Sequence, residues 1–191
     1  MAIDLKKGSK INLKKETSPA GGKVFIVGLG WDPDASASPH PIDLDASCFL
    51  VGYNAKLVSD EYFVFYNNPT SPDGSVIYSG DNRSGVGDGD DETLVVDTSK
   101  INPTVQQVVF CCSINEAEER GQTFRFVNNA YIRIYEQNTG QLIATYMLNE
   151  AASNETAFIL GRLINTNEGW EFEPYPIGYQ GGLSTLVDIY S

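Results

Sequence analysis

The sequence predicts a mostly β protein, folded as a two-sheet β-sandwich with a few short helices, in a single domain over residues 1–191. Short runs rich in Val, Ile, Phe and Tyr recur along the whole chain, and Gly, Pro, Asn and Asp cluster between them. β-Branched and aromatic residues are typical of strands, and regularly spaced short strands with little helix indicate a sandwich. A hydrophobic fraction of 41% is enough to fill one core.

The expected strands share apolar or β-branched residues bounded by turn-forming residues. In chain order they are residues 11–13, 23–30, 42–52, 62–66, 93–97, 105–113, 131–135, 142–148, 157–164 and 170–172. Turns at 138–140 and 165–169 carry the Asn and Gly that tight hairpins favour. The strands therefore include two hairpins in the second half of the chain.

Helical signals are few. The tail 181–190 has apolar residues with i, i+3, i+4, i+7 spacing, which predicts a helix. Residues 115–121 form a charged turn or one helical turn that ends at Gly121. Residues 102–105 are expected to begin a short helix.

Composition excludes several classes of function. The formal net charge is −12, so nucleic acid is not an expected partner, and direct membrane binding is disfavoured unless a cation bridges. The start of the chain has no apolar signal region, and no run approaches the roughly 18 apolar residues of a membrane span, so we expect a cytoplasmic protein. Cys48, Cys111 and Cys112 lack CxxC spacing and are expected to be small buried residues or exposed thiols rather than a redox pair.

Acidic residues cluster between Tyr66 and Glu92, where glycines alternate with carboxylates and Arg83 is the one opposing charge. Crowded carboxylates repel each other, and a hard cation such as Ca²⁺, which takes roughly 6–8 oxygen ligands, relieves that repulsion. In the run 42–52, Asp43 and Asp45 are expected on one face of a strand that reaches the same end of the sandwich. Together these residues offer enough carboxylates for two ions.

Other kinds of site fit less well. An EF-hand fails because Ala37, Val86 or Thr93 stands where each possible loop requires glycine. Zinc is disfavoured because His40 is the single histidine. The chain has neither a GxSxG nor a Walker motif. A carboxylate pair for glycoside hydrolysis and a plain exposed acidic turn remain as alternatives.

Several motifs together resemble the TerD family of tellurium-resistance and stress-response proteins. They are Gly30-Trp-Asp32, Ile42-Asp-Leu-Asp-Ala-Ser47, Phe65-Tyr-Asn-Asn68, Ser71-Pro-Asp-Gly-Ser-Val76, the run from Ser79 to Glu92, Asn154-Glu-Thr-Ala157 and Gly181-Gly-Leu183. The resemblance implies a bacterial, cytoplasmic, non-enzymatic β-sandwich that binds about two Ca²⁺ ions in acidic loops. Its expected partners are calcium ions and other proteins of the same stress-response system.

The resemblance also implies a set of metal ligands. They are Asp32, Asp43, Asp45, Asp73, Asp81, Asn82, Asp88, Asp90, Asp91 and Glu92, with carbonyls of Gly74, Val76 or Gly89 and, less strongly, Glu155. Val86 stands where relatives often carry an acidic residue, so one site is expected to be weaker. The alternatives are a calcium-dependent carbohydrate- or membrane-binding module, with Trp31, Tyr66 and Tyr78 as contacts, and a hydrolase in which the metal activates water.

Overall fold

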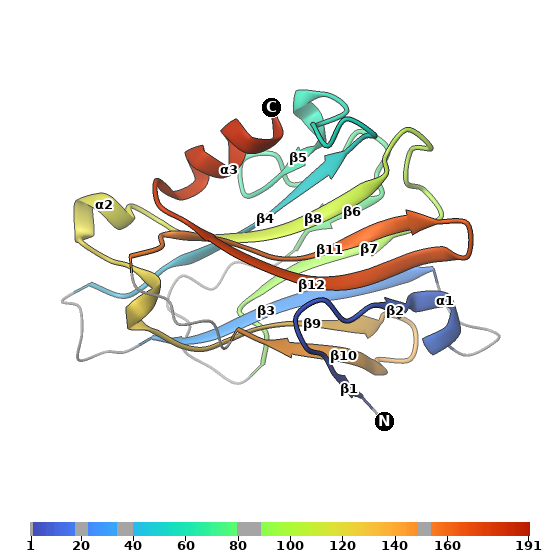
Figure 1. Cartoon of the computed structure of the whole chain (residues 1–191), viewed down its shortest axis with the longest axis horizontal. Coiled ribbons are helices and arrows are strands. Elements are labelled where there is room, and N and C mark those ends of the chain that lie inside the picture. Colours follow the sequence, from blue (N-terminus) through green and yellow to red (C-terminus); the bar gives the residue numbers. More distant parts are fainter. Residues whose placement is uncertain (1, 18–22, 34–39, 80–88, 149–153) are drawn as a thin grey trace.

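The computed structural model describes residues 2–17, 23–33, 40–79, 89–148 and 154–191. Two six-stranded sheets face each other, as the sequence predicted (Figure 1). Sheet A has the order β1-β10-β9-β3-β7-β6, and sheet B has the order β2-β12-β11-β8-β4-β5. Neighbouring strands are antiparallel except the parallel pair β1 and β10.

The strands of sheet A are β1 (Ile3–Asp4), β3 (Val24–Pro33), β6 (Val76–Tyr78), β7 (Glu92–Asp97), β9 (Val127–Glu136) and β10 (Leu142–Met147). Those of sheet B are β2 (Ile11–Asn12), β4 (Leu44–Val51), β5 (Phe63–Val64), β8 (Gln107–Ile114), β11 (Ala157–Thr166) and β12 (Gly169–Tyr179). The described helices are α1 (Leu13–Glu16), α2 (Ala117–Arg120) and α3 (Gly182–Tyr190), with 3₁₀ turns at Asp60–Tyr62 and Phe124–Phe126.

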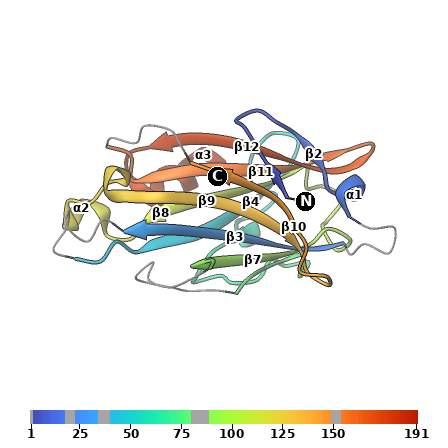
Figure 2. The same cartoon turned by 90° about the horizontal axis from the view of Figure 1, so that it is seen from below.

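The main core lies between the two sheets, and a smaller one lies between sheet B and α3. Leu186 and Tyr190 of α3 are buried against Phe49 of β4, which confirms the helical spacing in the tail. Cys112 faces the main core and Cys111 faces α3, so adjacent residues point to opposite sides of β8 as expected. Sheet A has no described helix across its outer face (Figure 2).

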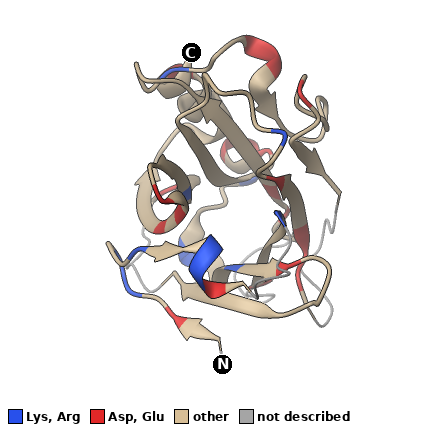
Figure 3. Ribbon diagram, turned by 90° about the vertical axis from the view of Figure 1, so that its right-hand side faces the viewer, with Lys and Arg blue, Asp and Glu red and all other residues tan. Residues whose placement is uncertain are grey.

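The N-terminal segment joins the two sheets along one side. β1 pairs with β10 in sheet A, and β2 pairs with β12 in sheet B. Leu5, Ile11 and Leu13 anchor this segment by burial. Its lysines at positions 6, 7, 10, 14 and 15 are exposed, as expected for an edge strand. Basic residues are drawn in blue on this segment in Figure 3.

Three local expectations were wrong. Residues 102–105 form a turn rather than a helix, because the Asn102 side chain accepts hydrogen bonds from the Thr104 backbone and hydroxyl. The strand expected over 62–66 is limited to β5, where the Asn68 side-chain amide donates a hydrogen bond to the Phe63 carbonyl at 2.6 Å. Leu13 starts α1 instead of ending a strand, because Asn12 caps that helix.

The segment between Tyr66 and Glu92 is not one loop. Its residues 76–78 form β6, which pairs with β7 at the edge of sheet A. This strand divides the acidic residues into a turn around Asp73 and a second group that ends at β7. Among the described residues, no helix is long and apolar enough to cross a membrane.

Candidate metal centre

Residues 89–92, here called the clamp segment, lead from the acidic stretch into β7. Two side chains of β9 hold its first half. The Tyr131 hydroxyl donates a hydrogen bond to the Gly89 carbonyl at 2.6 Å. The Arg133 Nε atom donates to Oδ1 of Asp90 at 2.5 Å, forming a partly buried ion pair.

The second half of the clamp segment is held by β3 and β4. The Asp91 backbone N–H donates to the Leu29 carbonyl at 2.8 Å, and the Trp31 N–H donates to Oδ2 of Asp91 at 3.0 Å. Oε2 of Glu92 accepts from the Ala46 N–H at 3.4 Å, which links sheet A to sheet B. Each residue of the clamp segment is therefore fixed by its own contact.

Two glycines of β3 make room for these contacts. A Cβ at Gly28 would lie 2.2 Å from the Asp90 carboxyl carbon, and a Cβ at Gly30 would lie 2.3 Å from the Tyr131 ring. Real Cβ atoms do not approach other atoms this closely, so any side chain here would displace Asp90 or Tyr131. The role of these two glycines depends on the partner strands and was not predicted from the sequence.

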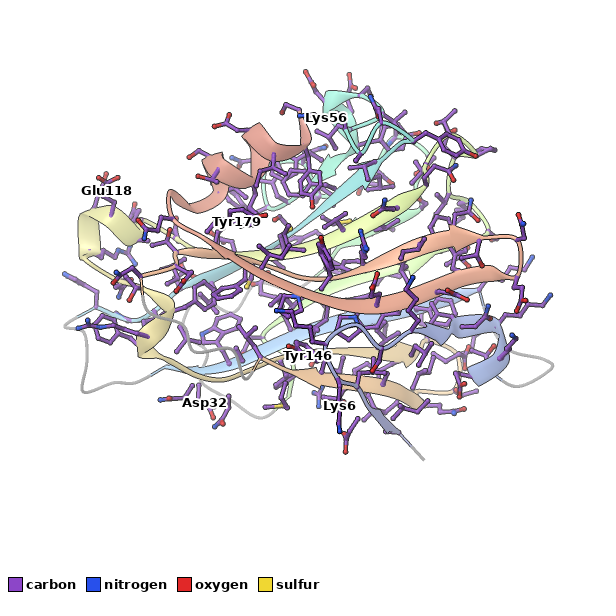
Figure 4. The ribbon with its side chains drawn as sticks, viewed as in Figure 1. Lys6, Asp32, Lys56, Glu118, Tyr146 and Tyr179 are labelled. Atoms are coloured by element: carbon purple, nitrogen blue, oxygen red, sulfur yellow. The ribbon has the colours of Figure 1, made fainter. Side chains whose placement is uncertain are left out.

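A first hollow of about 420 Å³ opens on the outer face of sheet A. Three predicted ligands line it, namely Asp32, Asp91 and the Gly89 backbone, and Arg133, which also lines it, pairs with Asp90. The Asn129 amide donates to Oδ2 of Asp32 at 2.7 Å. Asp32 lies at the lower edge of the view in Figure 4, on the sheet A side of the sandwich.

Charge in this hollow is balanced partly by Arg133. Burial lowers the pKa of Arg133, but the hydrogen bond and charge of Asp90 outweigh burial and raise it. Burial and the negative charge of Asp90 raise the pKa of Tyr131, so the phenol stays protonated and donates to Gly89. The guanidinium lies over two tyrosine rings, 4.8 Å from the centroid of Tyr131 and 5.1 Å from that of Tyr135.

Asp43 and Asp45 lie at the start of β4. β4 begins at Leu44, so Asp43 precedes the strand, and its Oδ2 accepts from the Asn115 amide at 3.1 Å. Asp45 lines a second hollow of about 710 Å³, together with residues of α2 such as Glu118. This second hollow lies on the sheet B side, so the described residues form two acidic groups rather than one shared cluster.

Asp73 is not brought to either hollow. Its Oδ1 accepts from the Ser71 hydroxyl at 2.7 Å and the Ser75 N–H at 2.9 Å, and its Oδ2 accepts from the Asn102 N–H at 2.8 Å. Burial raises the pKa of Asp73, but these hydrogen bonds outweigh burial and lower it. The Ser75 carbonyl accepts a hydrogen bond from the N–H of Asp97, the last residue of β7. This turn therefore lies at the opposite end of β7 from Glu92. The carbonyls of Gly74 and Val76 belong to the same end.

The predicted ligands Asp81, Asn82 and Asp88 lie outside the described residues. Within the described ranges, no group of three or more His, Cys, Asp or Glu side chains is placed to hold a metal ion. The donors around the first hollow are carboxylate and carbonyl oxygens, which suit Ca²⁺. A shell of roughly 6–8 oxygens needs more donors than these, so other residues of the acidic stretch would have to join them.

The structure shows whether the residues considered for sugar, lipid or redox functions are exposed or buried. Trp31 is 3% exposed and belongs to the core. Tyr66 is 48% exposed and lines the second hollow. Burial raises the pKa of all three thiols, so Cys48, Cys111 and Cys112 stay protonated and inert at neutral pH.

Comparison with known proteins matches residues 1–190 to the TerD domain. The Tellurium resistance protein TerD of Alcaligenes sp is 42% identical over 190 residues, which cover 100% of this chain and 97% of that protein. General stress protein 16U of Bacillus subtilis is also 42% identical over 190 residues, with the same coverage of 100% and 97%.

A solved structure supports the fold. The crystal structure of a homologue of telluride resistance protein from Streptomyces coelicolor A3(2) superposes with a TM-score of 0.70. The superposition covers 87% of this chain and 96% of that chain, at 24% sequence identity. At that identity the likeness concerns the architecture of the two sheets.

Proposed function

The chain belongs to the TerD family of tellurium-resistance and stress-response proteins, and on this premise we propose that it is a non-enzymatic Ca²⁺-binding protein. The observation that carries the proposal is the clamp segment. Through contacts to three different strands it fixes Asp91 at the hollow that Asp32 also lines, and it holds the neighbouring Asp90 against Arg133. Carboxylates held close together at a fixed separation repel, and binding of a divalent cation relieves the repulsion.

We assign one ion to the first hollow, with Asp32, Asp90 and Asp91 as ligands completed by Asp81, Asn82 or Asp88. Asp45 at the second hollow and Asp43, which accepts from the Asn115 amide at the same hollow, are the candidates for a second ion. Bound Ca²⁺ would supply positive charge at the acidic end. The chain's own residues do the positioning: Tyr131 and Arg133 hold the loop, and Glu92 ties it to the interior.

The metal-loaded surface would then be recognised by other proteins of the same stress-response system in the cytoplasm. The alternative carbohydrate- or membrane-binding module is less favoured, because Trp31 is buried and cannot stack on a sugar or insert into lipid. A hydrolase in which the metal activates water stays as an alternative, to be tested by a screen for hydrolytic activity that Asp81→Asn abolishes.

Trp31 provides a direct test. The chain has two tryptophans, so Trp170→Phe leaves Trp31 as the sole indole, joined through its backbone to Asp91. Titration of the chelator-treated variant with CaCl₂ should change the Trp31 emission in a saturable way, and calorimetry should give about two sites. Unchanged emission together with absent heat at millimolar Ca²⁺ would contradict the proposal.

A further inference from the structure

Arg133 lies in an unusual position for a surface arginine. It is the register partner of Gly28 across β9 and β3, and the missing side chain of Gly28 leaves room for the Asp90 carboxylate. The guanidinium meets that carboxylate at 2.5 Å, with side-chain exposures of 25% for Arg133 and 12% for Asp90. The pair is therefore shielded from most of the solvent.

The guanidinium also has little freedom to leave. Tyr131 and Tyr135 flank Arg133 on the same face of β9, and both rings lie within cation–π distance of it. Tyr131 is itself tied to Gly89 through its hydroxyl. If the ion pair opened, the positive charge would remain between these rings, close to the first hollow.

We propose that Arg133 is a tethered counter-cation that competes with Ca²⁺ for Asp90 and so lowers the calcium affinity of the acidic end. This inference rests on the proposed function. In the ion-free protein the guanidinium offsets the repulsion among Asp32, Asp90 and Asp91. An incoming divalent ion must then displace Arg133 from Asp90 or bind beside a fixed positive charge, and either costs binding free energy.

The expected size of the effect follows from Coulomb's law. Even at the dielectric constant of bulk water, a unit charge and a divalent ion about 6 Å apart repel enough to change the dissociation constant about tenfold, and a partly shielded site does not reduce this effect. Arg133→Met removes the charge but keeps a long side chain between the tyrosines. It should bind Ca²⁺ about tenfold more tightly than the wild type.

Two further variants separate charge from structure. Arg133→Lys keeps the positive charge but stacks less well on the tyrosine rings, so its calcium affinity should lie closer to that of the wild type than to that of Arg133→Met. Arg162→Met is the matched control, because Arg162 is also 25% exposed, pairs with Glu173 at 2.9 Å and lies 4.1 Å from the Tyr175 ring centroid, but on sheet B. It should leave calcium affinity unchanged. If Arg133→Met does not fold, Arg133→Gln serves in its place.

The experiment is calorimetric titration of the full chain with CaCl₂, with melting temperatures in chelator recorded for each variant. Tighter binding by Arg133→Met alone supports the inference. If the wild type binds Ca²⁺ and Arg133→Met binds equally or more weakly, Arg133 is not a competitor, although the proposed function stands. If no variant binds Ca²⁺ and the wild type does not either, both proposals fall.

Discussion

Oε2 of Glu92 on β7 accepts a hydrogen bond from the backbone N–H of Ala46 on β4, at 3.4 Å. The carboxylate is 1% exposed and lies between the two sheets. Because Asp90 and Asp91 directly precede it, this contact joins the acidic end to the core. The position of the candidate ligands is thus coupled to the packing of the sandwich.

Truncation of Glu92 should destabilise the protein. Glu92→Ala leaves the Ala46 N–H without its acceptor and opens a cavity, so we expect a loss of about 2–4 kcal/mol in the free energy of unfolding. Glu92→Gln keeps an acceptor and should cost less. Urea denaturation measures both. Glu168→Ala, at an exposed side chain, is the control and should stay within about 0.5 kcal/mol of the wild type. Equal stability of Glu92→Ala and the wild type would rule out this role.

A side chain at Gly28 should disturb the acidic end. In Gly28→Ala the new methyl group would overlap the Asp90 carboxylate, so we expect about 1–3 kcal/mol of destabilisation and weaker Ca²⁺ binding. Gly52→Ala is the matched control, because its Cβ would meet its nearest neighbour at an ordinary 3.5 Å. Thermal melts and calcium titrations of the two variants test the difference. Equal stability and equal calcium affinity of Gly28→Ala and Gly52→Ala would rule out a clash with Asp90.

Asp73 should support a turn without contributing to calcium affinity. Asp73→Ala removes three hydrogen bonds and should lower stability by about 1–3 kcal/mol. Its calcium affinity should equal that of the wild type, whereas Asp91→Ala should lose most of it. Weaker calcium binding by Asp73→Ala at full stability would show instead that Asp73 is a ligand.

The Asp73 carboxylate should also make the free energy of unfolding depend on pH. The folded pKa of Asp73 lies below its unfolded value near 3.8, so the stabilisation is complete above about pH 5 and is lost as the pH falls through the folded pKa. In urea titrations from pH 5 to pH 2, Asp73→Asn should show a shallower loss of stability than the wild type. Parallel curves would contradict the assignment.

The three thiols should be unreactive in the folded protein. Burial raises their pKa above the ordinary 9.0, so the reactive thiolate is scarce at neutral pH. Ellman's reagent should label them only after denaturation. Because the unfolded thiols ionise first, stability should also fall as the pH rises above about 9. Rapid labelling of native protein would show that a cysteine is accessible.

Much of the fold could be predicted from local patterns. The alternating run around Ile132 and Ile134 placed β9, and the spacing of Leu186 and Tyr190 placed α3. The sequence could not show that Asp73 and Asp90 lie apart. The strand between them, β6, has three residues, which is too few to be recognised from their pattern. Propensity identifies strands, but sheet register decides which ends meet.

The side chains around the acidic end were largely missed for the same reason. Arg133 meets Asp90 only because β9 and β7 flank β3 in sheet A. One signal was present: Tyr131, Arg133 and Tyr135 alternate with isoleucines, which places all three on one face. That pattern predicts a polar face on the strand, but it does not predict which residue this face contacts.

The most direct test of calcium binding at the acidic end is the melting temperature of the wild type in chelator and in millimolar CaCl₂, beside Asp90→Asn/Asp91→Asn. Ca²⁺ that binds only the folded state raises stability by RT ln(1 + [Ca²⁺]/Kd), so the wild-type melting temperature should rise and the double variant should lose most of the shift. Identical wild-type melting curves with and without Ca²⁺ would contradict the account.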